Sequence, residues 1–488
     1  MASVGDAITL DPAAISDNES VQVVMQIFEQ LVRYKEGSTQ VEPALALSWT
    51  VSADGTAWTF KLRRGVRFHD GTPLDADAVV FSFERQRDRQ HPFHFQAFTY
   101  WESTFRNVRE VTALGPDTVR IRINRPYAAF LANLAMFPAS IVSPTAMRRL
   151  GRGFSSQPVG TGPFRLLRWE RGERIRLVRN PDYWDGPPSA AHLVHEVISD
   201  EAQRLVAVQS GTVDVAYGLA PADRQLVKLH PDLNLYRVPG ENVAFLAMNT
   251  QRQPFDNVQV RRAVNHAVNK DLVVKLAYQG LATPATGPIP PTMWSYNPSI
   301  RRYAYDPARA RSLLREAGWR PSFHPRLFVM STPRPYLPAP VLVARIIARN
   351  LADVGMPVEV VVHPFSEHLR ATQMGEHDIC LGGWAADNGD PDNFLYLLLD
   401  RDNARRGAAR NQAMFGNESL HLLLTRARAE MDHLTRERLY RRAQEIVAEE
   451  APWVPLAHTD VVVAARRSVR KLQIHQSTVI FYRRVEKD

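Results

Sequence analysis

Two oppositely charged residues, Arg334 and Asp387, are the side chains of this sequence that could bind a small charged molecule. Arg334 follows the apolar run 326–330, and Asp387 follows the apolar run 378–384. A guanidinium group can form a forked pair with a carboxylate, and a carboxylate can form a charge-assisted bond with an ammonium group. Together the two residues could hold a short molecule with a charge at each end, such as a free dipeptide.

The two apolar runs are expected to be neighbouring strands of one α/β sheet. Helices are predicted at 340–353 and 366–374 with a strand at 357–362 between them, so strands and helices alternate along this segment. In open α/β sheets, ligands bind beyond the carboxyl ends of the strands. The alternative is that Arg334 pairs with a local carboxylate and Asp387 caps a turn, and sequence position alone favours this alternative.

The segment before residue 242 is expected to be a lobe of α+β type. Apolar and polar residues alternate at 57–64 and again around 119–123, which predicts half-buried strands. Amphipathic helices are predicted at 21–34 and after Asp75. The mixture of hairpins and helices is typical of an α+β fold.

The segment from 242 to 464 is expected to be an α/β lobe with mostly parallel strands. A continuous apolar strand opens it at 243–248, and helices should begin after Asn257 and Asp306. Further predictions are a helix at 435–449 and a last strand at 461–465. The strands after residue 464 are expected to return to the first lobe.

Composition indicates an ordinary globular protein rather than a nucleic-acid binder. The chain has 488 residues, 45% hydrophobic and 23% charged, with a formal net charge of +9. The basic residues are scattered and form no run interleaved with aromatic residues, so a nucleic-acid interface is disfavoured. The single cysteine, Cys380, cannot form an internal disulfide and is expected to be a small buried hydrophobe. The sequence has no apolar stretch of 18 or more residues, so no transmembrane helix is expected.

The sequence lacks the familiar motifs of enzymes and of phosphate-binding sites. There is no Gly-x-Ser-x-Gly motif, no phosphate-binding loop ending in Gly-Lys-Ser/Thr and no Gly-x-Gly-x-x-Gly after a strand. The turn Gly160-Thr161-Gly162 leads into a predicted strand, so it offers no helix N-terminus to a phosphate. We therefore expect no catalytic residues and no cofactor.

Metal sites are not expected either. The pairs His91/His94 and His363/His368 have no carboxylate or cysteine partner at a recognisable spacing, which favours surface histidines. The run 387–393 superficially resembles a calcium loop. The twelfth residue from Asp387 is Leu398, where an EF-hand loop needs a glutamate, so a turn-rich loop is the better interpretation.

The chain resembles the family 5 solute-binding proteins of ABC importers, the large peptide-binding receptors. The similarity covers nearly the whole length and is carried by segments 8–12, 45–49, 58–71, 75–82, 158–164 and 261–268. Within that family the chain is most similar to the dipeptide-binding branch. The resemblance implies a two-lobe periplasmic-binding-protein fold, class II-like and of the large cluster C type, with α/β and α+β lobes.

The resemblance also assigns roles to individual residues. In the dipeptide-binding branch an Asp after a Gly-Trp-x-x motif binds the ligand's α-ammonium group, and this position is Asp387. An Arg in an Arg-Pro-Tyr segment binds the α-carboxylate, and this position is Arg334. The same resemblance implies that Gly383 and Trp384 line the pocket and that Tyr336 packs nearby.

The resemblance implies two lobes. The first comprises residues 1–241 plus 465–488 and contains an inserted subdomain at about 42–157. The second comprises residues 242–464, and the ligand is expected in the cleft between the lobes. The implied function is non-enzymatic binding of a dipeptide or other short peptide through its free ends. The expected partner is an inner-membrane ABC permease, and the protein should be a monomer in the periplasm or another extracytoplasmic space. No signal peptide is visible, although family members begin with one, often of the lipoprotein type; a membrane anchor stays open.

Other functions remain open at this point. A receptor of the same family could bind a nickel chelate, haem, glutathione or a longer oligopeptide. An alternative of another class is a peptide hydrolase, for which no nucleophile and base can be found. Known dipeptide receptors often carry disulfides, which this chain cannot form, but that departure does not bear on binding.

Overall fold

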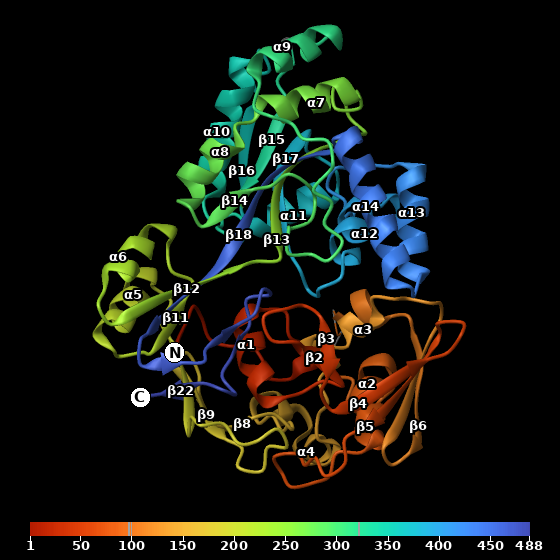
Figure 1. The fold of residues 1–488 in the computed structure, drawn as a ribbon, viewed down its shortest axis with the longest axis vertical. Helices are drawn as coiled ribbons and strands as arrows, with labels where there is room; N and C mark the ends of the chain where they lie inside the picture. The colour runs from red at the N-terminus through yellow and green to blue at the C-terminus, as the bar shows by residue number, and fades with distance from the viewer. Residues whose placement is uncertain (96–97, 99, 321–322) are drawn as a thin grey trace. The chain divides into compact units, whose positions relative to one another are not determined.

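A computed structural model describes residues 1–95, 98, 100–320 and 323–488 of the chain (Figure 1). The chain divides into two compact units, each with its own hydrophobic cores. Unit 1 comprises Met1–Val238 and Val461–Asp488, and unit 2 comprises Pro239–Asp460. Among the described residues, no helix is both long and apolar enough to cross a membrane.

Unit 1 contains a sheet to which both ends of the chain contribute. Its strand order is β18-β11-β1-β10-β9-β8, with only the last part of β18 in this unit. Helices α5 and α6 bury Leu205, Val208 and Val227 beside β1 and β11. The elements of this region are β1 (Ala2–Ser3), β8 (Phe164–Glu170), β9 (Arg174–Arg179), β10 (His192–Val197), α5 (Glu201–Ser210), β11 (Val215–Tyr217), α6 (Arg224–Leu229) and β12 (Leu233–Pro239).

A separate four-stranded antiparallel sheet forms a second layer within unit 1, in the order β4-β5-β7-β6. Trp58, Phe60 and Ile121 alternate toward a common core that α2 covers. Asp75 caps α2 by accepting a hydrogen bond from the amide of Ala78, so the helix start predicted there is confirmed. These elements are β4 (Ala46–Val51), β5 (Ala57–Leu62), α2 (Ala76–Arg87), β6 (Val108–Gly115) and β7 (Thr118–Ile123).

The helix predicted at 21–34 is wrong in its second half. Helix α1 spans Asn18–Ile27, and β2 (Val32–Tyr34) pairs with β3 (Val41–Pro43). The amide of Gly162 donates to the carbonyl of Ile27, and a Cβ atom at Gly160 would lie 2.2 Å from the same carbonyl oxygen. Two glycines thus allow a tertiary contact to replace the next helical turn.

Glu29, two residues after the end of α1, lies in a buried polar cluster. Its carboxylate accepts hydrogen bonds from the Thr161 hydroxyl, the Tyr183 hydroxyl and the Trp184 indole, at 2.8, 2.8 and 2.9 Å. Burial raises the pKa of Glu29, and the three donors oppose that rise. The Gly160-Thr161-Gly162 turn therefore has a structural use, and it continues into the strand β8 as predicted.

Unit 2 is built on a mixed sheet in the order β16-β15-β17-β13-β18. Strand β15 is parallel to both β16 and β17, whereas β13 is antiparallel to both β17 and β18. The expectation of mostly parallel strands therefore holds only for the β16-β15-β17 part. The strands are β13 (Asn242–Met248), β14 (Ala282–Pro284), β15 (Arg326–Met330), β16 (Glu359–His363), β17 (Ile379–Ala385) and β18 (Trp453–Arg466).

Helices flank this sheet within unit 2 (Figure 1). Asn257 caps α7 and Asp306 caps α9, as predicted. Helices α12 and α13 lie where no helix was predicted. The helices are α7 (Val258–Ala267), α8 (Lys270–Val273), α9 (Pro307–Glu316), α10 (Pro340–Asp353), α11 (Phe365–Gln373), α12 (Asp392–Leu399), α13 (Glu418–Ala429) and α14 (His433–Glu450).

Strand β18 is far longer than the strand predicted at 461–465. It begins at Trp453 and includes Pro455, which lies opposite Phe245 where the register with β13 shifts. A proline inside a strand is tolerated at such an irregularity because no ladder hydrogen bond is needed from its nitrogen. Up to Asp460 the strand belongs to unit 2, and from Val461 it belongs to unit 1.

Two single-residue expectations have different outcomes. Cys380 is fully buried in β17, and burial raises the pKa of its thiol, which confirms the expected hydrophobic role. His368 was expected at the surface but is only 1% exposed, because α11 turns it toward the sheet. Burial lowers the pKa of His368 to about 4.

Candidate functional site

Arg334 and Asp387 lie beyond the carboxyl ends of two adjacent parallel strands of unit 2. Strand β15 ends at Met330 and β17 ends at Ala385, and the two pair in register through Leu327 with Ile379. The loop after each strand therefore leaves the sheet at the same edge. This is the edge at which open α/β sheets bind ligands.

Arg334 is held in a tight turn with its side chain against an aromatic ring. Its backbone exchanges two hydrogen bonds with Leu337, at 3.0 and 2.8 Å. Its guanidinium carbon lies 4.4 Å from the centroid of Phe365, the first residue of α11. Stacking on a ring fixes the plane of a guanidinium group without occupying its donors.

The donors of Arg334 are not used by an ion pair. Among the residues that the structure describes, no ion pair involves Arg334. Its Nε–H group is buried and has no hydrogen-bond acceptor within the same described part of the chain. Among the described residues, the structure shows no carboxylate paired with Arg334, so the alternative of a local ion pair has no counterpart in this part of the chain. A buried donor without an acceptor is costly and calls for a partner.

Tyr336 joins the Arg334 loop to the end of β17. A Cβ atom at Gly383 would lie 2.2 Å from Tyr336 Cδ2, so the ring covers the bare α-carbon of this glycine. The hydroxyl of Tyr278 donates to the carbonyl of Tyr336 at 3.0 Å. Burial raises the pKa of Tyr336, and the neighbouring Arg334 guanidinium opposes that rise.

Trp384 and Asp387 share one partner, the side-chain amide of Asn393. Asn393 Oδ1 accepts from Trp384 Nε1 at 2.8 Å and from the Asp387 amide at 3.0 Å. Asn393 Nδ2 donates to Asp387 Oδ2 at 3.4 Å. The indole and the carboxylate are thereby held by a single group, and both side chains are half-buried.

Two carboxylates of the acidic run 387–393 pair with arginines of two helices. Asp390 pairs with Arg436 of α14 at 2.8 Å, and Asp392 pairs with Arg428 of α13 at 3.0 Å. Both carboxylates are buried. The run is a turn leading into α12, which agrees with the predicted turn-rich loop up to the start of that helix.

Three residues of this site were missed in the sequence: Phe365, Tyr278 and Asn393. Phe365 and Tyr278 lie in segments that read as ordinary core, and no local pattern distinguishes them. Asn393 had a usable signal, because it follows Asp-Pro-Asp at a point where a helix begins. An Asn in the first turn of a helix is available to bind groups of the preceding loop.

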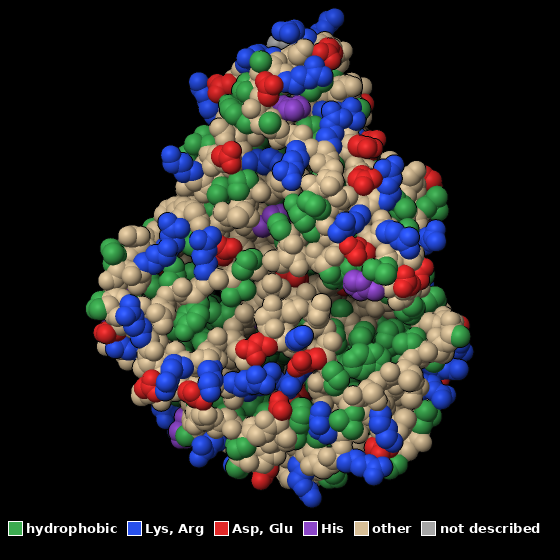
Figure 2. Space-filling view, in the orientation of Figure 1, with side chains coloured by type: hydrophobic (Ala, Val, Ile, Leu, Met, Phe, Trp, Pro, Cys, Tyr) green, Lys and Arg blue, Asp and Glu red, His purple; other side chains and the backbone are tan. Residues whose placement is uncertain are grey.

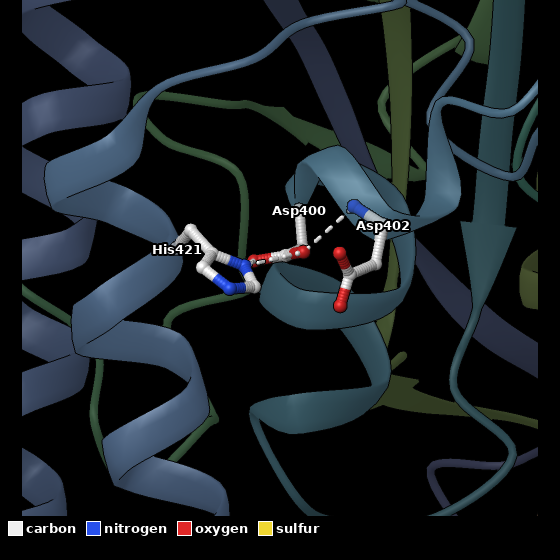
Figure 3. Close-up of side chains that lie close together, drawn as sticks. All are labelled: Asp400, Asp402 and His421. Carbon is white, nitrogen blue, oxygen red and sulfur yellow. Dashed lines mark hydrogen bonds and ion pairs between the residues drawn. The ribbon is translucent and has the colours of Figure 1, made fainter.

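A second polar cluster of unit 2 contains Asp400, Asp402 and His421, whose ligand-type atoms lie within 4.8 Å of one another (Figure 3). His421 of α13 contacts the Asp400 carboxylate at 3.0 Å, and Asp400 also accepts from the Asp402 amide at 2.9 Å. The Tyr396 hydroxyl donates to Asp402 at 2.9 Å. Asp400 thereby caps the short helix Arg401–Asn403. The dashed lines in Figure 3 mark its contacts with the Asp402 amide and with His421.

A known protein family matches most of this chain. Residues 40–405 match the family described as bacterial extracellular solute-binding proteins, family 5 Middle. The chain is 38% identical over 469 residues to heme-binding protein A of Haemophilus influenzae, covering 92% of this chain and 84% of that protein. It is 37% identical over 460 residues to the dipeptide-binding protein of Escherichia coli, covering 91% and 86%.

Solved structures show the same fold. HbpA2 from Haemophilus parasuis matches with a TM-score of 0.93 and 32% identity, over 99% of this chain and 98% of that one. DppA from Helicobacter pylori in complex with the peptide STSA matches with a TM-score of 0.83 and 34% identity, over 100% and 97%. The dipeptide-binding protein from Pseudoalteromonas sp. SM9913 in complex with Met-Leu matches with a TM-score of 0.84 and 28% identity, over 100% and 99%. The fold class expected from the sequence is confirmed.

Proposed function

This chain belongs to the family 5 bacterial extracellular solute-binding proteins, and we propose on that premise that it binds a dipeptide or other short peptide by its free ends. It would act as the substrate-binding component of an ABC importer. Relatives are named as dipeptide-binding and di/tripeptide-binding proteins, and two similar solved structures contain peptides. These names and complexes support the peptide class of ligand.

The observation that carries the proposal is the state of Arg334. Its guanidinium is stacked on Phe365, pairs with no described carboxylate and has a buried Nε–H without an acceptor among the described residues. A ligand carboxylate would supply the acceptors through a forked pair. An unpaired charge enclosed in a protein costs several kcal/mol, so each end of a zwitterionic ligand needs such a partner.

Asp387 would bind the other end of the ligand, the α-ammonium group. It follows β17 at the sheet edge that Arg334 shares, and an ionised carboxylate can accept from several donors at once. Trp384 and Gly383 would line the pocket and Tyr336 would pack beside it. Ligand side chains would contact mainly water, which permits broad specificity.

The biological setting follows from the same proposal. The protein would work outside the cytoplasmic membrane as a monomer, either free or anchored, and would deliver its ligand to a membrane permease. It would bind the peptide without chemical change. Incubation with a dipeptide should therefore release no free amino acids, whereas release would indicate a peptide hydrolase.

Haem is the second candidate ligand, because one relative at 38% identity is named a heme-binding protein. The two ligands make different demands on the site. A dipeptide has one carboxylate and one ammonium group, whereas haem has two carboxylates and no ammonium group. Asp387 should therefore matter for a dipeptide and not for haem. A thermal-shift panel of dipeptides, tripeptides, glutathione, haem and nickel chelates would separate the remaining candidates.

The test is calorimetric titration of Ala-Ala into the wild-type protein and the variants Arg334→Ala and Asp387→Ala. Each variant should bind at least about tenfold more weakly, equivalent to about 1.4 kcal/mol, while remaining folded. Arg345→Ala, which changes an exposed arginine of α10, is the matched control and should bind normally. Wild-type affinity in both site variants would disprove the two-ended clamp.

A further inference from the structure

The side-chain amide of Asn393 contacts two groups of the candidate site at once. Its Oδ1 accepts from the Trp384 indole at 2.8 Å and from the Asp387 amide at 3.0 Å, while its Nδ2 lies 3.4 Å from Asp387 Oδ2. The half-buried amide therefore joins an aromatic ring to a carboxylate.

The chemistry of the contacts fixes which way the amide points. Two N–H donors converge on one atom of Asn393, so that atom must be the oxygen. The NH₂ group must then face the Asp387 carboxylate. A leucine at this position would leave both N–H donors without this acceptor, and an aspartate would place a second negative charge beside Asp387.

The backbone around Asn393 is held by several contacts. The backbone amide of Asn393 donates to the carbonyl of Asp390 at 3.0 Å in the first turn of α12. The Asp390 carboxylate pairs with Arg436 at 2.8 Å, and both side chains are buried. Arg436 also donates to the Ala427 carbonyl and the Tyr440 hydroxyl. The side-chain amide of Asn393 thus contacts Asp387 from a position that is held in place through Arg436 of α14.

We propose that Asn393 is a positioning residue for recognition of the ligand's free ammonium group. It orients the Asp387 carboxylate and keeps Trp384 beside it, without itself touching the ligand. This inference rests on the proposed dipeptide function and makes it more specific. It predicts that loss of Asn393 impairs recognition of the amino end and leaves recognition of the carboxyl end intact.

The experiment compares Ala-Ala with N-acetyl-Ala-Ala, which lacks the ammonium group, by calorimetric titration into wild type and Asn393→Leu. In Asn393→Leu the affinity for Ala-Ala should fall at least tenfold, while that for the acetylated peptide changes less than threefold. Asn403→Leu is the matched control, since Asn403 is also half-buried and its amide donates to the Tyr396 carbonyl at 2.8 Å, near the other end of α12. This control should keep the wild-type preference for the free amino end.

The outcomes separate the positioning role from the function on which it rests. The positioning role alone would be overturned if Asn393→Leu kept the wild-type preference for Ala-Ala over N-acetyl-Ala-Ala. It would also be overturned if the affinity for both peptides fell equally. Failure of the wild-type protein to bind Ala-Ala would overturn the proposed function and this inference with it.

A second variant covers the case in which Asn393→Leu does not fold. Asn393→Asp keeps an acceptor for both N–H donors but places a carboxylate against Asp387. Two neighbouring carboxylates oppose each other's ionisation. When the pH is lowered, Ala-Ala binding by Asn393→Asp should therefore weaken at a higher pH than binding by wild type does. A pH profile of binding identical to that of wild type would contradict the proposal.

Discussion

The ring of Tyr336 lies directly on the α-carbon of Gly383. A Cβ atom at this glycine would be 2.2 Å from Tyr336 Cδ2, closer than any real contact allows. Tyr336 lies two residues after Arg334, and Gly383 lies four residues before Asp387. This contact therefore packs the loop that carries Arg334 against the strand that precedes Asp387.

Replacing Gly383 with alanine should push the loop that carries Arg334 away from β17. The added methyl group must displace the Tyr336 ring, so we expect Gly383→Ala to bind Ala-Ala at least tenfold more weakly. Overpacking of this kind also lowers the free energy of unfolding by about 1–3 kcal/mol. Gly416→Ala is the control, because the nearest atom to its new Cβ would be Arg401 Cβ at 3.8 Å. Calorimetry and urea unfolding provide the measurements, and unchanged affinity in Gly383→Ala would argue against a role for this contact.

Removal of Arg436 should destabilise unit 2 strongly. Arg436→Met leaves the buried Asp390 carboxylate without its ion-pair partner, and such a loss costs about 3–5 kcal/mol of unfolding free energy. The double variant Arg436→Met/Asp390→Leu should be more stable than the sum of the single effects predicts, because it leaves no uncompensated charge. Arg442→Met, which changes an exposed arginine of α14, should alter stability by less than about 0.5 kcal/mol. If urea unfolding showed that the two single losses of unfolding free energy simply add in the double variant, Arg436 and Asp390 would not stabilise each other.

His377 should make stability depend on pH. Burial lowers its pKa from 6.5 to about 4, and its Nε2 contacts the Gln412 carbonyl at 2.7 Å. Above pH 6.5 both the folded and the unfolded state hold a neutral His377. Between pH 6.5 and 4 only the unfolded chain takes up the proton, so the free energy of unfolding falls as the pH falls through this window.

The variant His377→Gln should therefore lose less stability than wild type between pH 7 and pH 4.5, by about 2–3 kcal/mol. Replacement of the exposed His192 by glutamine should leave the wild-type pH dependence unchanged. Parallel stability curves for wild type and His377→Gln would contradict the prediction.

The local patterns of unit 2 predict its elements well. The strand expected at 326–330 is β15, and the helix expected at 340–353 is α10, with the same bounds. Proline at the start of α10 and the left-handed Gly355 just after its end explain this success, because both residues restrict where a helix can begin or stop. The adjacency of the strands before Arg334 and Asp387 followed from the same alternation.

Features that depend on contacts distant in the sequence could not be predicted. The helical pattern of 21–34 continues past Ile27, but the backbone of Gly162 takes the carbonyl that the next turn would need. The last strand was predicted only from 461, whereas β18 begins at Trp453 and continues through Pro455, where the register against β13 shifts. The position of Asn393 after Asp-Pro-Asp indicates a residue near a helix start, but not that its side chain contacts Trp384 and Asp387.

A backbone hydrogen bond joins the two ends of unit 2. The amide of Gly240, at the start of the unit, donates to the carbonyl of Thr459, at its end, at 3.1 Å. Unit 2 is one uninterrupted segment whose two ends adjoin, and residues of unit 1 precede and follow it in the sequence. Such a segment can be cloned as an independent gene for residues 239–460. It would carry Arg334, Asp387 and Asn393 together, so the contribution of this half of the molecule to ligand binding could be weighed by itself.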